Sequence, residues 1–199
     1  MKNVLVINSS LSHDKGNSNI LSQKLLARLQ ASTAVNVVER NLAEMELPHL
    51  TMNEMLAWGS EVSSRSEEQV ALNSLSELFI ADLQQADTVV IGMPMYNFGV
   101  PSTFKAWIDR VARAGITFKY TETGPQGLLS NKKVYVLAAR GGMYAGTPKD
   151  TQTEYLKDVL GFLGLTDIDF VYAEGLAMGP DAAATAWSNA EKSISSLIA

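Results

Sequence analysis

The run VLVI at residues 4–7, followed by SSLSHDKGNS at residues 9–18, decides the fold. VLVI is continuously apolar, which is typical of a strand covered on both faces in a parallel sheet. After the polar segment, leucines recur at helical spacing over residues 20–30. A buried strand, a short polar loop and an amphipathic helix together begin a parallel strand–helix–strand unit.

The same alternation continues along the rest of the chain. Short apolar runs predict further strands at residues 35–38, 88–91, 134–138 and 168–173. Helical spacing predicts further helices at residues 67–85, 102–113, 155–163 and 182–198, and Gly115 suits the end of the second of these. Because strand and helix alternate about five times, we predict a doubly wound α/β fold. Its five-stranded parallel sheet has the flavodoxin-like order 2-1-3-4-5, with helices on both faces.

Neither a linker nor an internal repeat divides the sequence, so we expect a single domain over residues 1–199. Residues 47–66 are the one irregular stretch. Its Met52, Met55 and Trp58 suit either a cover for a pocket or partner, or an ordinary surface excursion. Both interpretations stay open from the sequence.

Composition excludes several classes of protein. The chain has a net charge of -5 and 46% hydrophobic residues, which argues against disorder and against a nucleic-acid partner. It has 0 cysteines, which excludes disulfides, zinc–thiolate sites, iron–sulfur clusters and a catalytic thiol, and we expect no metal. No apolar run approaches the roughly 18 residues of a membrane span, and no targeting segment is visible. We therefore expect no membrane partner and a cytoplasmic location.

The first polar loop has the composition of a phosphate site. It offers Ser10, Gly16, Asn17 and Ser18 where a helix begins, and Asn17 and Ser18 are both good N-caps. Neither a Walker A ending nor a Gly-x-Gly-x-x-Gly fingerprint is present. Hydroxyls and backbone amides suit a monoester such as that of FMN. The alternative is ordinary capping of a helix.

Two further loops follow the third and fourth predicted strands. GMPMYNFGVP at residues 92–101 offers flat aromatic and thioether surface beside free backbone N–H groups, which suits a flavin ring. The alternative for these aromatic residues is packing into the core. AARGGM at residues 138–143 contains paired glycines that let a backbone approach a ligand closely, or that merely permit a turn. In the predicted strand order, the three loops meet at one edge of the sheet.

At this point the sequence resembles the FMN-dependent NADH-azoreductases. The similarity rests on PMYNF at residues 94–98, VARAGITFKYTE at 111–122 and RGG at 140–142. It extends to GPQGL at 124–128, LGFLG at 160–164 and AEG at 173–175. These segments cover nearly the whole chain in the order of the family.

The resemblance implies a homodimer that binds FMN, takes electrons from NADH or NADPH, and reduces quinones and azo compounds. The cofactor-binding residues that it implies are Ser10, Gly16, Asn17, Ser18, Pro94, Met95, Tyr96, Asn97, Phe98, Ala139, Arg140, Gly141 and Gly142. Asn97, Tyr120 and Phe162 would line the substrate pocket. Gly16 and Ala139 stand where a well-known form of the family motif has hydroxyl residues. The sequence leaves open whether FMN is retained less tightly, and loss of binding is not expected.

The hypothesis for the chemistry is a two-step shuttle. NADH would give hydride to flavin N5, and the acceptor would take NAD's place and receive it, which predicts ping-pong kinetics. No side chain is assigned as catalytic, since His13 and His49 suit structural or solvated roles. Two alternatives are a flavodoxin-type electron carrier, without substrate turnover of its own, and a flavin-free α/β binding module.

Overall fold

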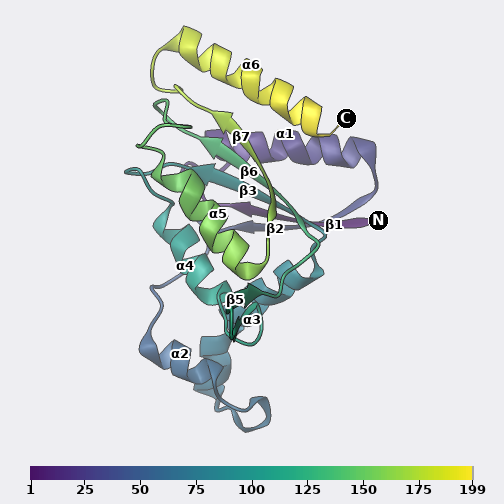
Figure 1. The fold of residues 1–199 in the computed structure, drawn as a ribbon, viewed down its shortest axis with the longest axis vertical. Coiled ribbons are helices and arrows are strands. Elements are labelled where there is room, and N and C mark those ends of the chain that lie inside the picture. Colours follow the sequence, from purple (N-terminus) through teal and green to yellow (C-terminus); the bar gives the residue numbers. More distant parts are fainter. Residues whose placement is uncertain (199) are drawn as a thin grey trace.

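A computed structural model describes residues 1–198 and shows a five-stranded parallel sheet in the order β2-β1-β3-β6-β7 (Figure 1). The strands are β1 (Lys2–Asn8), β2 (Val35–Asn41), β3 (Thr88–Pro94), β6 (Lys133–Ala139) and β7 (Asp167–Ala173). With β6 and β7 counted as the fourth and fifth strands of this sheet, its order is the predicted one. Each predicted strand lies within an observed strand.

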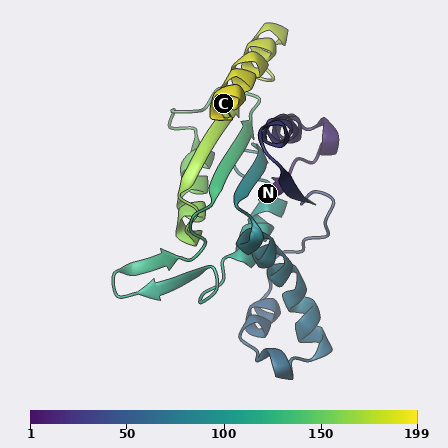
Figure 2. The same ribbon diagram turned by 90° about the vertical axis from the view of Figure 1, so that its right-hand side faces the viewer.

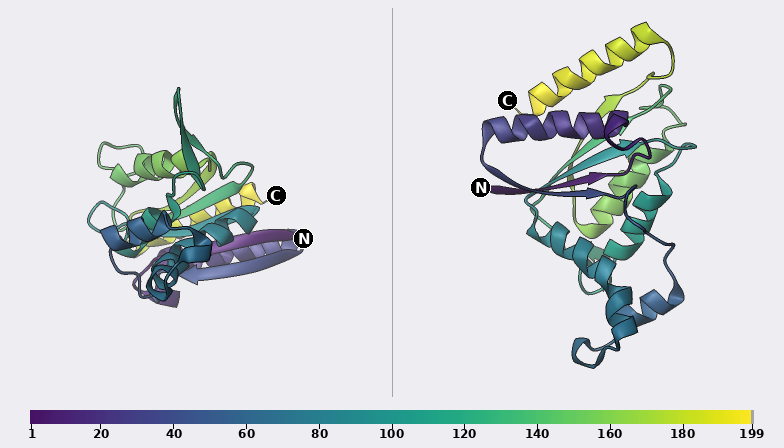
Figure 3. Two further views of the ribbon diagram at one scale, coloured as in Figure 1. Left: turned by 90° about the horizontal axis from the view of Figure 1, so that it is seen from below. Right: turned by 180° about the vertical axis from the view of Figure 1, so that it is seen from behind.

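Helices pack on opposite faces of the sheet, which explains the continuously apolar strands. Val4 and Val6 pack with α1 (Asn17–Ser32) and α6 (Pro180–Leu197). Leu5 and Ile7 point to the other face, where α3 (Glu67–Gln85), α4 (Ser102–Val111) and α5 (Thr151–Leu163) lie. The right-hand view of Figure 3 shows α1 and α6 on one side of the strands and the other helices opposite. Successive residues of a strand therefore enter two different cores.

Some helix boundaries differ from the prediction. The helix predicted at residues 102–113 ends at Val111, and Ala112 is its C-cap, so Gly115 does not end it. Gly115 instead lies in the following turn with a φ of 80°. The helix predicted at residues 67–85 has the observed bounds, because Ser66 and Gln69 form a capping box at its start.

Two segments contain structure that was not predicted. Residues 47–66 contain a helix, α2 (Met52–Trp58), and a 3₁₀ turn at Val62–Ser64. A hairpin of β4 (Phe118–Thr121) and β5 (Gly124–Gly127) forms a separate two-stranded sheet. Figure 2 shows this hairpin projecting away from the main sheet. The strand GPQG has no alternation of apolar and polar residues, and the alternation of FKYT covers only four residues, which is too short to predict a strand.

The carboxyl ends of β1, β3 and β6 lie at the same edge of the sheet. The strand pairing places Asn8 beside Gly92, and Pro94 beside Ala139. The three loops singled out in the sequence leave the sheet at this edge. Within residues 1–198, none of the helices combines the length and the apolar character that crossing a bilayer demands.

Candidate functional site

A cavity of about 270 Å³ lies where these three loops meet. Its lining residues are Ser10, Ser12, Lys15, Gly16, Asn17, Ser18, Pro94, Met95, Tyr96, Ala139, Arg140, Gly141, Leu176 and Ala177. Of the predicted cofactor-binding residues, Asn97, Phe98 and Gly142 do not line it. Its position at the carboxyl ends of parallel strands is where open α/β sheets bind ligands.

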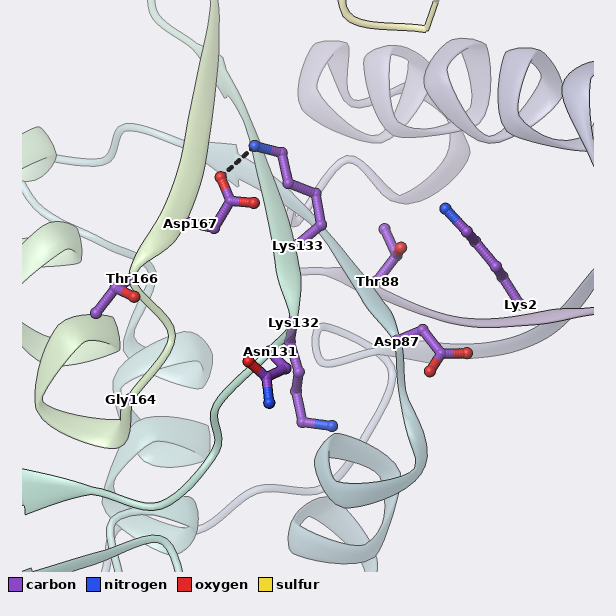
Figure 4. A pocket seen from close by; sticks show the side chains of 9 residues that line it. All are labelled: Lys2, Asp87, Thr88, Asn131, Lys132, Lys133, Gly164, Thr166 and Asp167. Atoms are coloured by element: carbon purple, nitrogen blue, oxygen red, sulfur yellow. Dashed lines mark hydrogen bonds and ion pairs between the residues drawn. The ribbon is translucent and has the colours of Figure 1, made fainter.

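A larger cavity, of about 650 Å³, lies at the opposite edge of the sheet, among the first residues of the strands (Figure 4). Two of its three lysines, Lys132 and Lys133, already have partners. Lys133 lies 2.5 Å from Asp167 and 2.8 Å from Asp169. Burial opposes the charge of Lys133, but hydrogen bonds to both carboxylates raise its pKa. Lys132 donates to two backbone carbonyls, and burial lowers its pKa. We therefore assign ligand binding to the smaller cavity.

The start of α1 forms one end of the smaller cavity. Gly16 is its N-cap, in place of the predicted Asn17 or Ser18, and no side chain caps the helix. The sequence prediction was wrong because Ser10 packs against this position. A Cβ at Gly16 would lie 2.3 Å from Ser10 Oγ. The first-turn amides of α1 thus have no intrahelical acceptor, and they point with the helix dipole toward the cavity.

Tyr96 joins the first loop to the second. Its hydroxyl accepts a hydrogen bond of 2.9 Å from the backbone N–H of Leu11 and lies 3.4 Å from Ser10 Oγ. Ser9 Oγ also donates to the carbonyl of Gly92 at 3.0 Å. The phosphate-type loop and the aromatic loop are therefore held together before any ligand is considered.

The aromatic loop contains a tight turn at its tip. Tyr96 and Gly99 exchange backbone hydrogen bonds of 3.1 and 2.9 Å. Asn97 and Phe98, between them, have φ values of 49° and 63°, in the left-handed region that favours glycine. The Phe98 ring is 51% exposed and meets Tyr144 edge-on at 5.6 Å. A flat apolar surface thus remains accessible beside the cavity.

The side chain of Arg140 does not point at solvent. It is fully buried and lies 3.0 Å from both Asp150 and Glu174, with its guanidinium over the ring of Tyr172. Burial disfavours the charge on Asp150, but hydrogen bonds from Arg140 and Thr153 hold the pKa of Asp150 below its usual value. The guanidinium of Arg140 is thus neutralised within the protein, and its backbone N–H already donates to the carbonyl of Ala173 at 2.9 Å.

Four cavity residues were missed by the sequence analysis. Ser12 and Lys15 lie inside the quoted first loop, and their hydroxyl and ammonium groups could have been included on chemistry alone. Leu176 and Ala177 follow β7, and their N–H groups donate to the carbonyls of Arg140 and Gly141. The signal for this second pair is Gly175, whose φ of 77° turns the chain back toward the site.

Tyr120 and Phe162, both predicted for the substrate pocket, do not line the cavity. Phe118 lies between them, with its ring 5.5 Å from Tyr120 and 4.2 Å from Phe162. Thr151 donates to the carbonyl of Phe98 at the start of α5. Phe162 is near the other end of that helix, about 16 Å away at ~1.5 Å per residue. One chain therefore does not bring both aromatic residues to Asn97.

The residues present fit a ligand with a phosphate group and a flat ring. Uncapped amides, serine hydroxyls and Lys15 surround one end of the cavity, which is the donor set that a phosphate needs. Met95, Tyr96 and Gly141 line the cavity as well and suit a flat ring. FMN has both of these parts.

Comparison with known proteins also finds FMN-dependent enzymes. FMN-dependent NADH:quinone oxidoreductases are 50% identical over 198 residues in Pseudoalteromonas atlantica (100% of this chain, 98% of the relative) and 52% identical over 195 residues in Paraburkholderia phymatum (98% of each). An FMN-dependent NADH-azoreductase from Bacillus anthracis, solved in complex with FMN, superposes with a TM-score of 0.86 at 26% identity over 100% of both chains. A second azoreductase structure from Bacillus anthracis gives a TM-score of 0.88 at 28% identity, covering 100% of this chain and 99% of that one.

A family model described as having a flavodoxin-like fold matches residues 2–198. The match spans the sheet, the helices on both of its faces and all three loops of the cavity. The chain therefore belongs to this family of flavodoxin-like proteins.

Proposed function

We propose that this protein is an FMN-dependent oxidoreductase that takes electrons from NADH and reduces quinones and azo compounds. One observation carries the proposal. The start of α1, which no side chain caps, meets the loops at residues 92–101 and 138–143 at the carboxyl edge of the sheet. The relatives named above, which cover almost the whole chain, support the same activity.

The first loop would hold the phosphate of FMN. The amides of Asn17 and Ser18 and the hydroxyls of Ser10 and Ser12 are neutral donors, and Lys15 adds a positive charge. Gly16 contributes no side chain, so the helix start keeps its donors for the ligand. We therefore expect the hydroxyl missing at position 16 to have little effect on retention of FMN.

The second and third loops would hold the ring. Met95, Tyr96, Asn97 and Phe98 would offer one wall. On the other side, Gly141 and Gly142 would offer backbone N–H donors, since the N–H of Arg140 already donates to Ala173. Bound FMN supplies the two-electron chemistry, accepting hydride from NADH and passing it to the acceptor. The N–H groups of Gly141 and Gly142 would stabilise negative charge on the reduced ring. The exposed Phe98 leaves room for a flat substrate.

A homodimer would complete the substrate pocket. Tyr120 is 74% exposed on the projecting hairpin and does not line the cavity of its own chain. A second copy can bring Tyr120 and Phe162 over the cavity of the first. The exposed apolar side chains of Met52, Met55 and Leu56 on α2 support such an association.

The test is a visible spectrum followed by anaerobic addition of NADH. The purified protein, or the protein reconstituted with FMN, is expected to show flavin absorption that bleaches on mixing with NADH and returns when a quinone is added. Bleaching without return in quinone would favour an electron carrier. A fully loaded protein that NADH never bleaches would contradict the proposal.

A further inference from the structure

The turn from Tyr96 to Gly99 is the most strained backbone beside the cavity. Asn97 and Phe98 both have positive φ, and Phe98 is a bulky residue that rarely adopts this conformation. Strain of this kind persists only where the surrounding structure holds it in place. The contacts that hold this turn are therefore candidates for a functional role.

The first turn of α5 supplies these contacts. The side-chain amide of Gln152 donates to the carbonyl of Pro94 at 2.9 Å and to that of Gly99 at 3.2 Å. The hydroxyl of Thr151 donates to the carbonyl of Phe98. Gln152 is fully buried, and its two acceptors bracket the strained turn from both ends. One amide group thus closes the turn onto the end of β3.

Arg140 determines which way this amide points. Its Nε lies 3.4 Å from Gln152 Oε1, and a guanidinium can only donate hydrogen bonds. The oxygen of Gln152 must therefore face Arg140, which leaves the NH₂ group for the two carbonyls. Asp150 and Glu174 hold Arg140 from opposite sides. Glu174 also accepts from the backbone N–H groups of Tyr144 and Ala145, which follow the paired glycines.

We propose that Gln152, oriented by Arg140, is a positioning residue that holds the Tyr96–Gly99 turn in the shape that binds the flavin ring. It does not line the cavity and acts through the backbone of the turn. This inference rests on the proposed binding of FMN. It adds a buried side chain, outside the three loops, that sets the distance between two of them.

The test compares two variants that remove the same chemical group. Gln152→Met replaces the amide with an apolar side chain of similar length. Asn73→Leu is the matched control, because Asn73 is also fully buried and donates to two backbone carbonyls, those of Ala57 and Gln69, in the α2–α3 region. Both variants are expected to unfold at lower urea concentration. Only Gln152→Met is expected to raise the dissociation constant for FMN, by about tenfold, as the loss of these hydrogen bonds implies.

Two further readouts separate positioning from stability. Hydrogen–deuterium exchange of residues 94–99 in the FMN-free protein is expected to quicken in Gln152→Met and not in Asn73→Leu. The midpoint potential of bound flavin is expected to fall, because a looser turn stabilises the reduced ring less well. A tenfold change in the ratio of affinities for the two redox forms corresponds to about 30 mV.

Thr151→Val repeats the test at an exposed position, should the buried variant fail to fold. Faster exchange of residues 94–99 and weaker FMN binding in this variant would support the proposal. Unchanged exchange, affinity and potential in whichever of the two variants folds would overturn it. If the unsubstituted protein itself does not bind FMN, the proposed function fails, whereas the exchange measurement on the FMN-free protein still reports on the role of Gln152.

Discussion

Ser10 packs so closely against Gly16 that no side chain fits at position 16. A side chain at position 16 would lie 2.6 Å from Ser10 Cβ, which cannot move without its backbone. Gly16 therefore caps α1 without a hydroxyl, and the amides of the first turn keep their donors. The sequence predicts the loop and its phosphate chemistry, but capping preferences favour Asn17 and Ser18. Only the packing of Ser10 identifies the cap.

At the same scale, Asp150 makes stability depend on pH. Its pKa lies below the ordinary value of 3.8, so its ionised form stabilises the fold at neutral pH, and this contribution is lost as the pH falls through the lowered value. Asp150→Asn keeps an acceptor for the N–H of Thr153 and removes the charge facing Arg140. We expect a loss of about 2 kcal/mol in the free energy of unfolding at pH 7.

Urea unfolding of both proteins at pH 7 and at pH 3 checks this expectation. The difference in unfolding free energy between the two proteins should narrow at pH 3, because Asp150 in the unfolded chain, with its ordinary pKa of 3.8, then takes up a proton. A gap of the same size at both pH values would mean that the charge of Asp150 contributes nothing.

Among the elements, α2 buries a charged residue and exposes its large apolar ones. Glu54 and Ala57 are buried, while Met52 and Leu56 are 66% and 68% exposed. Glu54 pairs with the buried Arg110 of α4 at 2.8 Å. Sequence periodicity cannot find such a helix, because the rule that apolar residues face the core is reversed here. The same 47–66 stretch therefore reads as irregular, although Thr51 caps a real helix.

The Glu54–Arg110 pair gives a prediction for this element. Glu54→Ala leaves a buried guanidinium without its partner and is expected to cost about 3 kcal/mol of unfolding free energy. Glu54 Oε1 and Arg110 Nε have no hydrogen-bond partner within residues 1–198, so the pair is incompletely satisfied. We expect the double variant Glu54→Leu, Arg110→Met to recover most of the loss in urea unfolding. A double variant no more stable than Glu54→Ala would show that the ion pair stabilises the junction beyond what apolar packing supplies.

At the scale of the whole molecule, the sequence predicts the main sheet well because each strand is a local apolar run with its own signal. The site is predicted in part, since its three loops are contiguous segments. The hydrogen bonds from Gln152 that hold the Tyr96–Gly99 turn were not predicted. Gln152 and Pro94 are 58 positions apart in the chain, and nothing in the sequence around either residue marks it as a partner of the other. The β4–β5 hairpin was missed for a different reason. Its strands are only four residues long, and apart from the buried Phe118 their residues are exposed or half-buried, so no core-facing pattern marks them.

The position of that hairpin leads to the last prediction, which concerns assembly. If Tyr120 of one chain completes the site of its partner, two defective chains can repair each other. Tyr120→Ala removes the aromatic wall, and Asn17→Glu places a negative charge at the exposed start of α1, where it repels the phosphate of FMN. In a heterodimer, the first chain supplies an intact FMN cavity and the second supplies an intact Tyr120.

Co-refolding the two variants in equal amounts is expected to restore about a quarter of the unsubstituted quinone reductase activity, because half of the dimers are mixed and each has one complete site. Each variant alone should stay well below this value, and sedimentation should give the mass of a dimer in all three samples. If the site lies within one chain, every chain in the mixture carries a defect of its own, and mixing gains nothing. That result would remove the partner's Tyr120 from the site while leaving the FMN cavity of each chain as described.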